Sequence, residues 1–499
     1  MRRPARPAAP GVPQRHDAHG HTLVAMSTPG PAGPAGAERL PHPLVVRTVP
    51  LTLPAADDER AVHPAHDVTD LLVGHPDAAD LLDLLPAPGS AAADDRPPLA
   101  WVRRGDGLVG WGEALRFEVG GATRFADAEA AWHEVLEHAV VRDEVRVPGS
   151  GPVAFASFAF DDESPAGGVV VVPRVVVGRR GEHAWLTTMT AGYTGPTLGP
   201  VPDLEALAGE RVAPTSPGTV TYSDGAVAPD GWRDVVAAGI AAVRAGEVDK
   251  VVLARDVVAR TEHPLDARWA LHRLADRYPS CWTFSVDGLL GATPELLVRS
   301  EKGLVTSRVL AGTIRRTGDD DADLARAAIL AHSSKDLEEH EYAVRSVAHA
   351  LEPFCSSTNV PDVPFVLHLP NVLHLASDIT GVLGTLEVDG PQHPSSLALA
   401  AALHPTAAVC GTPTQGAAAL IRRIEGMDRA RYAGPVGWFG ADGDGEWGIA
   451  LRSAQTSSSD ERAVRLFAGC GIVAASDPAA ELAESEAKLV PMRTALASD

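Results

Sequence analysis

Residues 230–258 read DGWRDVVAAGIAAVRAGEVDKVVLARDVV, and the spacing of their apolar residues changes once along the segment. Val236 and Ile240, with apolar neighbours at helical spacing, predict a helix that ends near Gly246. The residues Lys250–Val258 are rich in valine, which predicts a buried strand. A helix that leads directly into such a strand is typical of an α/β fold.

The rest of the chain divides into three portions. From residue 44 to about 228, short apolar runs such as Val169–Val172 are separated by Gly, Pro and Asp clusters, which predicts a sheet-rich N-terminal portion. From residue 229 to 497, predicted helices and strands alternate, and we expect this portion to supply the chemistry. Residues 1–43 are rich in Pro, Gly and Ala and should be disordered. We hypothesise that Met26, within this tail, is the true start of translation.

Charge and composition exclude several classes of protein. The chain has 499 residues, with 43 Lys and Arg against 65 Asp and Glu, and a net charge of −22. A field of that sign opposes nucleic acid and anionic membranes, so we expect neither as a partner. No long apolar run and no secretion signal are evident, so we expect a cytoplasmic protein. The four cysteines lack metal-ligand spacing and should be reduced thiols, and no docking segment is evident, so we expect a monomer.

Two charged residues beside predicted strands are candidates for acid–base chemistry. Lys250 opens its strand, and alternation places Val252 and Ala254 on the same face. Its side chain either extends from the strand end into water as an ammonium group, or has its pKa lowered by partial burial so that the neutral amine acts as a general base. Glu295 heads another apolar strand, and it is either a solvated edge residue or a proton donor whose pKa is raised by burial. These residues alone leave both alternatives open.

Carboxylates on two predicted helices are candidates for binding a metal ion. Glu339 lies in an acidic cluster within one helix, and Glu484 lies four residues before Lys488 on one face of another. These groups are either solvated surface charges or the two carboxylates that Mg²⁺ commonly binds in proteins.

Two further features are candidates for binding a carboxylate of a ligand. Arg452 either forms a structural ion pair or holds a carboxylate in a bidentate fork. The Gly469–Gly471 segment follows a predicted strand, and we expect a turn there whose backbone N–H groups receive a carboxylate.

Between Trp232 and Met492 the chain contains a series of different short blocks that are polar or rich in glycine. In order they are Lys250-Val-Val-Leu-Ala-Arg255, Thr293-Pro-Glu-Leu-Leu297, Leu310-Ala-Gly-Thr313, Glu339-His-Glu341, His374-Leu-Ala376, His404-Pro-Thr406, Val436-Gly-Trp438, Gly445-Glu-Trp447, Phe467-Ala-Gly-Cys-Gly-Ile-Val473, Ser476-Asp-Pro478, and Glu481 with Glu484 and Lys488. One block alone is weak evidence, but the ordered set is specific. The set resembles the chorismate-utilising enzymes, which include isochorismate, salicylate, anthranilate and aminodeoxychorismate synthases.

The resemblance implies a large α/β fold, with two packed, mainly antiparallel sheets and helices outside them. It implies chorismate as substrate and Mg²⁺ as cofactor, with Glu339 and Glu484 as metal ligands. It also implies Lys250 as catalytic base and Glu295 as catalytic acid. The substrate-binding residues that it implies are Ala311, Gly312, Thr313, His374, Thr406, Ala408, Tyr432, Arg452, Gly469, Gly471 and Lys488.

The nucleophile distinguishes the members of this family. Members that add water resemble this chain in having a lysine at position 250, because water needs a general base. Anthranilate synthases typically have glutamine there, and aminodeoxychorismate synthases typically have lysine at the position of Ala311. The resemblance therefore implies an isochorismate synthase, with a product for menaquinone or siderophore biosynthesis. A salicylate synthase, which also eliminates pyruvate, is the alternative, although the His404–Thr406 block and Ala408 favour the former.

Overall fold

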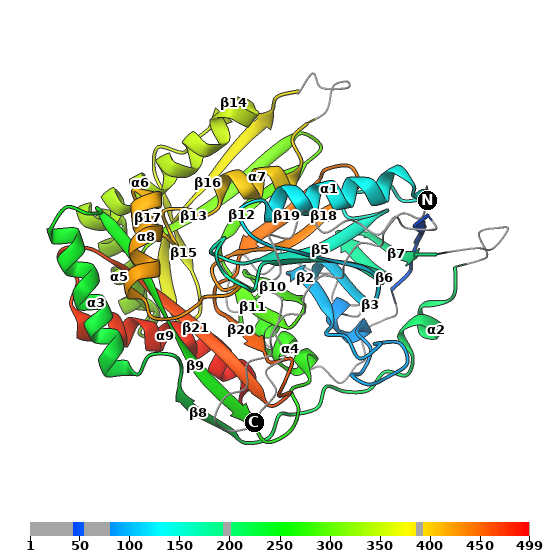
Figure 1. The fold of residues 1–499 in the computed structure, drawn as a ribbon, viewed down its shortest axis with the longest axis horizontal. Coiled ribbons are helices and arrows are strands. Elements are labelled where there is room, and N and C mark those ends of the chain that lie inside the picture. Colours follow the sequence, from blue (N-terminus) through cyan, green and yellow to red (C-terminus); the bar gives the residue numbers. More distant parts are fainter. Residues whose placement is uncertain (1–42, 54–79, 193–200, 386–392, 499) are drawn as a thin grey trace, which may run out of the picture. The chain divides into compact units, whose positions relative to one another are not determined.

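The computed structural model (Figure 1) describes residues 43–53, 80–192, 201–385 and 393–498. The predicted tail, with Met26, lies outside the described residues apart from Pro43. None of the helices in these described ranges combines the length and the apolar character needed to cross a membrane.

Helices and short 3₁₀ turns are spread along the described chain. They are η2 (Leu81–Leu84), α1 (Arg124–Glu137), α2 (Leu204–Ala208), α3 (Pro229–Arg244), α4 (Ala267–Arg277), α5 (Asp320–His332), α6 (Ser334–Leu351), η3 (Glu352–Phe354), α7 (Ser396–Leu403), α8 (Thr414–Ile424) and α9 (Pro478–Leu496).

Strands occupy most of the remaining described chain. They are β1 (Val45–Pro50), β2 (Leu99–Arg103), β3 (Asp106–Val119), β4 (Val140–Asp143), β5 (Val153–Phe158), β6 (Gly168–Arg180), β7 (His183–Thr190), β8 (Val220–Asp224), β9 (Lys250–Thr261), β10 (Trp282–Val286), β11 (Leu289–Thr293), β12 (Leu296–Glu301), β13 (Leu304–Arg315), β14 (Cys355–Asn359), β15 (Phe365–His368), β16 (Val372–Leu383), β17 (Gly411–Thr412), β18 (Pro435–Gly440), β19 (Gly445–Ile449), β20 (Ser453–Thr456) and β21 (Ala463–Ile472).

These strands pair into one continuous network, which is antiparallel except where β1 meets β4. Two arms of the network diverge from the long strand β6. One arm continues through β5, β18, β19, β12, β13 and β16. The other continues through β3, β2, β10, β11, β20, β21 and β9. The predicted fold class is confirmed, and the strands of the two expected sheets form these two arms.

The two arms contact each other around a shared apolar core. Trp101 on β2 and Trp282 on β10 both donate an indole N–H to Glu446 on β19, at 2.9 and 3.1 Å. Phe155 on β5 and Phe284 on β10 are fully buried in the same core. Because β5 and β2 pair with β18 and β10, strands from both predicted portions lie in each arm.

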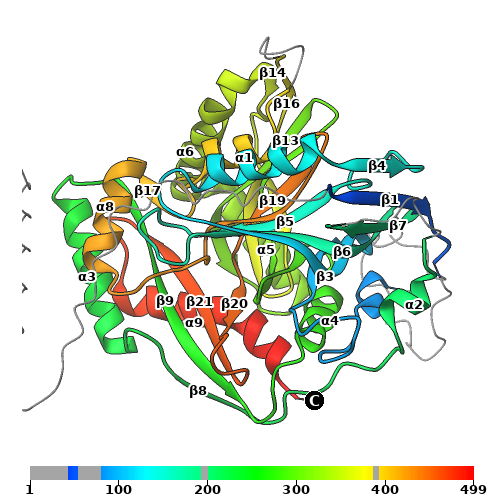
Figure 2. The ribbon, with the colours of Figure 1, turned by 45° about the vertical axis from the view of Figure 1, so that its right-hand side comes forward.

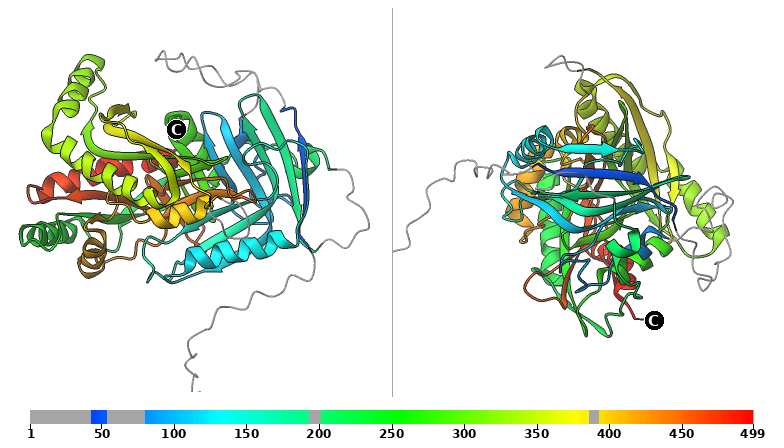
Figure 3. Two further views of the ribbon diagram at one scale, coloured as in Figure 1. Left: turned by 90° about the horizontal axis from the view of Figure 1, so that it is seen from above. Right: turned by 90° about the vertical axis from the view of Figure 1, so that its right-hand side faces the viewer.

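Helices cover the far ends of the two arms. In Figure 2, α3, α8 and α9 lie beside β9 and β21, and α6 lies beside β13. Figure 3 shows α1, in cyan, running along strands of the N-terminal portion, where it packs on β3 and β6. The strands at the far ends of both arms, and the helices that cover them, therefore all belong to the C-terminal portion of the chain.

The predicted helix that ends near Gly246 and the predicted strand that begins at Lys250 are both present, as α3 and β9. Ser333 separates α5 from α6, and its hydroxyl caps α6 by accepting from the backbone N–H of Asp336. The turn expected at Gly469–Gly471 is wrong, since these residues lie inside β21, paired with β9. Arg452 lies just after β19, which stops at Ile449, and it has a φ of 48°.

Candidate active site

A cavity of about 200 Å³ lies where the far ends of the two arms meet. Strands β9 and β21 supply one wall, β13 and β16 supply another, and residues of α6 and α9 also line it. The structure brings together nearly all residues predicted for the site: Lys250, Glu295, Ala311, Gly312, Thr313, Glu339, His374, Ala408, Tyr432, Arg452, Gly469, Gly471, Glu484 and Lys488. Thr406 is the exception, and it lines a smaller neighbouring cavity beside Glu295.

The wall formed by β9 and β21 is built around the side chain of Lys250. Alternation along β9 turns Lys250, Val252 and Ala254 toward the cavity, as their spacing predicted. A Cβ atom on Gly471 would lie only 2.9 Å from Lys250 Cε. Glycine at 471 therefore leaves the space that the lysine occupies, which is a different contribution from the expected anion-binding turn.

Glu295 lies in the connection between β11 and β12 and is 5% exposed. Burial raises the pKa of its carboxyl to about 8, although the positive charges of Lys250, Arg452 and Lys488 oppose the change. The carboxyl therefore keeps its proton at neutral pH. Lys250 and Glu295 thus offer one amine and one neutral carboxylic acid to the same cavity.

Each of the two predicted metal ligands is paired with a lysine. Lys250 Nζ lies 2.6 Å from Glu339 Oε1, and Lys488 Nζ lies 2.7 Å from Glu484 Oε1. Burial alone would raise the pKa of Glu484, but the Lys488 ammonium holds it below the usual value. The Lys488 ammonium thereby favours the ionised form of the partly buried Glu484 carboxyl.

The donor set fits a hard divalent cation. Glu339 and Glu484 present carboxylate oxygens to the same cavity, and such oxygens are the protein ligands that Mg²⁺ prefers. Cys470 Sγ lies with carboxylate oxygens of Glu481 and Glu484 in a group whose members are within 4.8 Å of one another. Burial raises the pKa of the Cys470 thiol to about 12, and a neutral thiol is a poor ligand for Mg²⁺.

The opposite wall presents a neutral histidine. A bulge at Gly312, with φ of 79°, interrupts the pairing of β13 with β16. Beside it, Thr313 Oγ1 lies 2.9 Å from His374 Nδ1. Burial, then Arg452 and Lys488, lowers the pKa of His374 to about 3, so its ring is neutral. Its buried Nε2 atom has no hydrogen-bond partner among the described residues, and it can bind an oxygen of a ligand.

Cations and an aromatic ring complete the cavity. The Arg452 guanidinium makes no hydrogen bond or ion pair with the described part of the chain, so it can bind a ligand carboxylate. Lys488 Nζ donates to the carbonyl of Gly469 at 2.8 Å as well as to Glu484. The ring of Tyr432 stacks on Phe467, with centroids 5.0 Å apart.

Comparison with known proteins identifies the family. A family model described as chorismate binding enzyme matches residues 80–497. The chain belongs to the chorismate-binding enzyme family. It is 40% identical over 282 residues to isochorismate synthase DhbC of Bacillus subtilis, which covers 54% of this chain and 69% of that protein.

Two further members of the chorismate-binding family extend the comparison. The salicylate biosynthesis isochorismate synthase of Pseudomonas aeruginosa is 33% identical over 468 residues, covering 88% of this chain and 93% of that protein. The structure of MenF, the menaquinone-specific isochorismate synthase from Escherichia coli, has the same fold, with a TM-score of 0.70 and 24% identity, covering 91% of this chain and 95% of that one.

Sequence reasoning missed some cavity residues of this chorismate-binding enzyme. Asp336 lines the cavity one helical turn before Glu339 on α6, and that spacing was the available signal. Glu481, which the sequence groups with Glu484 and Lys488 without indicating a role, also lines the cavity, one turn before Glu484 on α9. Arg429 also lines the cavity, where Glu425 holds it through contacts of 2.6 and 2.7 Å. No local pattern marks Arg429, because its other partners lie on distant segments.

Proposed function

We propose that this chorismate-binding enzyme is an isochorismate synthase. The observation that carries the proposal is that Lys250 and Glu295, an amine and a protonated acid, line one cavity. The names of the relatives from Bacillus subtilis and Pseudomonas aeruginosa support the same activity. In this reaction water adds at ring carbon 2 of chorismate while the 4-hydroxyl group leaves.

Lys250 is the proposed base. As the water oxygen bonds to carbon 2, Lys250 Nζ takes one proton from the water. Its side chain is 13% exposed and reaches the cavity from the end of β9. Lys250 can accept this proton only as the neutral amine, so the ammonium that pairs with Glu339 at 2.6 Å must first release a proton to solvent. Another cation held by Glu339 would replace that pairing.

Glu295 is the proposed acid. Both ring double bonds shift by one position, the bond from carbon 4 to its oxygen breaks, and Glu295 protonates the departing hydroxyl group so that it leaves as water. This step needs a carboxyl that holds its proton at working pH, and burial supplies that condition by raising the pKa to about 8.

The remaining cavity residues bind and orient the substrate in this proposal. Arg452 and Lys488 supply positive charge for its carboxylates, and His374 offers a neutral ring nitrogen to an oxygen of the substrate. Mg²⁺ held by Glu339 and Glu484 would bind a substrate carboxylate and hold the ring in place. All of these groups line the one cavity, which favours a single bound orientation.

Product analysis tests the proposal. The purified chain is incubated with chorismate and Mg²⁺, with a chelator in a parallel sample, and the products are separated by chromatography. Isochorismate as the Mg²⁺-dependent product is the expected result. Salicylate with pyruvate would replace the proposal by a salicylate synthase, and unchanged chorismate would refute it.

We also propose that the enzyme works in the cytoplasm as a monomer. Cys281, Cys355, Cys410 and Cys470 are all free thiols, and three of them are buried, which suits a reducing compartment. Light scattering on the purified chain tests the monomer, and a stable dimer would refute it. Proteins named for menaquinone and for salicylate synthesis both match this chain. We therefore propose isochorismate as the product and assign it to neither pathway.

A further inference from the structure

A segment without regular structure carries Tyr432 into the cavity. Residues 428–434 lie in the connection between α8 and β18, and two alanines in them, Ala430 and Ala433, have positive φ values of 49° and 61°. Left-handed backbone is unfavourable for alanine, so the contacts around the segment must hold it in place. Tyr432 and Ala433 both line the cavity, which makes the shape of this segment part of the cavity wall.

Arg431, next to Tyr432, holds the segment through contacts with residues that do not line the cavity. Its buried guanidinium donates to Ser157 Oγ at 2.7 Å and to Gln455 Oε1 at 2.9 Å. It also donates to the backbone carbonyl of Asp287 at 2.7 Å and lies 3.2 Å from the Asp287 carboxylate. These four contacts tie one side chain to β5, to β20 and to the hairpin between β10 and β11.

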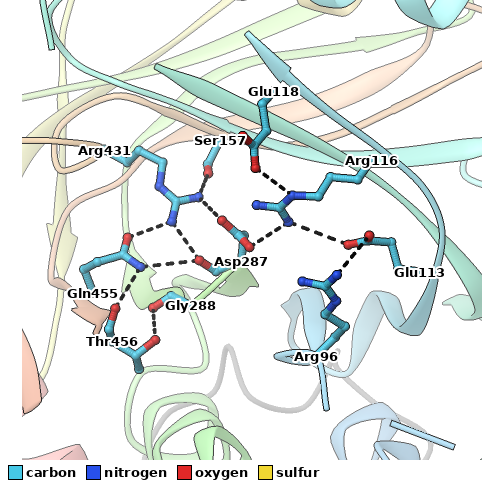
Figure 4. A network of polar contacts seen from close by, with 10 residues as sticks. All are labelled: Arg96, Glu113, Arg116, Glu118, Ser157, Asp287, Gly288, Arg431, Gln455 and Thr456. Atoms are coloured by element: carbon cyan, nitrogen blue, oxygen red, sulfur yellow. Dashed lines mark hydrogen bonds and ion pairs between the residues drawn. The ribbon is translucent and has the colours of Figure 1, made fainter. Parts of the chain in front are cut away.

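Asp287 lies at the centre of this network. Figure 4 shows Arg431 and Arg116 pointing toward Asp287 from opposite sides. Arg116, on β3, approaches the other carboxylate oxygen at 2.8 Å. Asp287 and Gly288 have φ values of 50° and 77°, which is the two-residue hairpin turn that an Asp-Gly pair favours. The rigid turn therefore fixes a carboxylate between two arginines.

The segments that meet at Asp287 lead into the cavity. Strand β11 begins directly after this turn and ends just before Glu295, and β20, which carries Gln455, begins directly after Arg452. Neither Asp287 nor Arg431 lines the cavity. Any effect of Asp287 on the reaction must therefore pass through residues such as Tyr432.

We propose that Asp287 is a positioning residue, whose carboxylate holds Arg431 and thereby fixes Tyr432 and the 428–434 segment against the substrate. The effect on turnover rests on the proposed function, whereas the effect on the segment does not. Loss of the carboxylate leaves Arg431 buried without an anionic partner. The 428–434 segment, with its two left-handed alanines, is then held less firmly, because Arg431 ties it to the neighbouring strands.

The variant Asp287→Asn tests the proposal because asparagine is also favourable in this turn and keeps the backbone carbonyl. Its KM for chorismate should rise by about fivefold or more with kcat within about threefold, since Tyr432 contributes to binding and the proposed acid and base are untouched. The matched control is Asp266→Asn, which removes a buried carboxylate from Arg268, 2.7 Å away, outside the cavity. That control should lower thermal stability with KM within about twofold of wild type.

Amide hydrogen exchange gives a readout without substrate. The amides of Tyr432, Ala433 and Gly434 bond within the segment or to Ala450, and in Asp287→Asn they should exchange about tenfold faster or more. The control should leave them unchanged. Unchanged exchange together with an unchanged KM in Asp287→Asn would overturn the proposal. Absence of chorismate turnover by the wild type, with faster exchange in the variant, would overturn the proposed function only.

Two further variants separate positioning from general destabilisation. Adding Ala430→Gly to Asp287→Asn removes the unfavourable left-handed alanine, so KM and exchange should return toward wild type. A double variant as impaired as the single one would contradict the role of strain. If Asp287→Asn does not fold, Arg431→Lys is the alternative test. Lysine keeps the positive charge but lacks the planar guanidinium that makes several hydrogen bonds at once, so the same amides should exchange faster.

Discussion

Replacing Glu295 by glutamine should abolish turnover and at the same time stabilise the folded protein at alkaline pH. The pKa of this carboxyl is about 8 in the folded chain, against an ordinary value of 4.5. Between these two values the unfolded chain releases the proton while the folded chain keeps it. The folded state therefore binds more protons, and its stability falls as pH rises through this interval.

The size of this stability change follows from the interval between the two pKa values. Each pH unit between the two values costs the folded wild type about 1.4 kcal/mol, and the whole interval costs on the order of 5 kcal/mol. Glutamine has nearly the same shape and does not ionise, so Glu295→Gln is free of this cost. Its stability relative to wild type should rise steadily from about pH 5 to about pH 8 and then level off.

Urea unfolding at several pH values between about 5 and 8, without substrate, measures this difference. Glu446→Gln is the matched control, because Glu446 is also buried but its pKa lies below the ordinary value, despite burial, through Arg299 and Trp101. That carboxyl is ionised in both states above about pH 5, so the control should be less stable by a constant amount. A constant difference for Glu295→Gln as well would refute the reasoning.

Three other variants probe the cavity. Lys250→Ala should lower kcat by about 10³-fold while calorimetry still detects chorismate binding, and normal turnover would remove its role as base. Gly471→Ala places a Cβ atom 2.9 Å from Lys250 Cε, so steady-state kinetics should show kcat lowered about tenfold or more with a similar KM; unchanged kcat would mean that Lys250 can move aside. Glu484→Gln should weaken Mg²⁺ binding about tenfold or more in a titration, and an unchanged titration would exclude Glu484 as a ligand.

Local patterns predicted those parts of the site that depend on one element. Alternation along β9 was enough to place Lys250, Val252 and Ala254 on one face, and helical spacing was enough to group Glu484 with Lys488. In each case the information lies within a few residues of the position.

Features that depend on distant residues were not predictable in this way. Glycines at 469 and 471 suggested a turn, because nothing nearby shows that β9 pairs with this segment or that Lys250 needs the space beside Gly471. Asp287 is 144 residues from Arg431 and 171 from Arg116, so their network has no local signal. The resemblance to chorismate-utilising enzymes supplied the long-range arrangement that the residues alone left open.

Charge balance explains how a chain with a net charge of −22 can hold a substrate with two carboxylates. Lys250 and Lys488 are each paired with a glutamate, so without ligands their charges are already compensated. The proposed Mg²⁺ and a substrate dianion bring no net charge when they bind together. Either one alone would change the charge of a partly buried cavity by two, which is costly where the dielectric constant is low. Substrate and metal should therefore favour each other's binding. When Glu339 and Glu484 bind the metal, the ion pairs with Lys250 and Lys488 would be replaced, and both lysines could then contact the substrate.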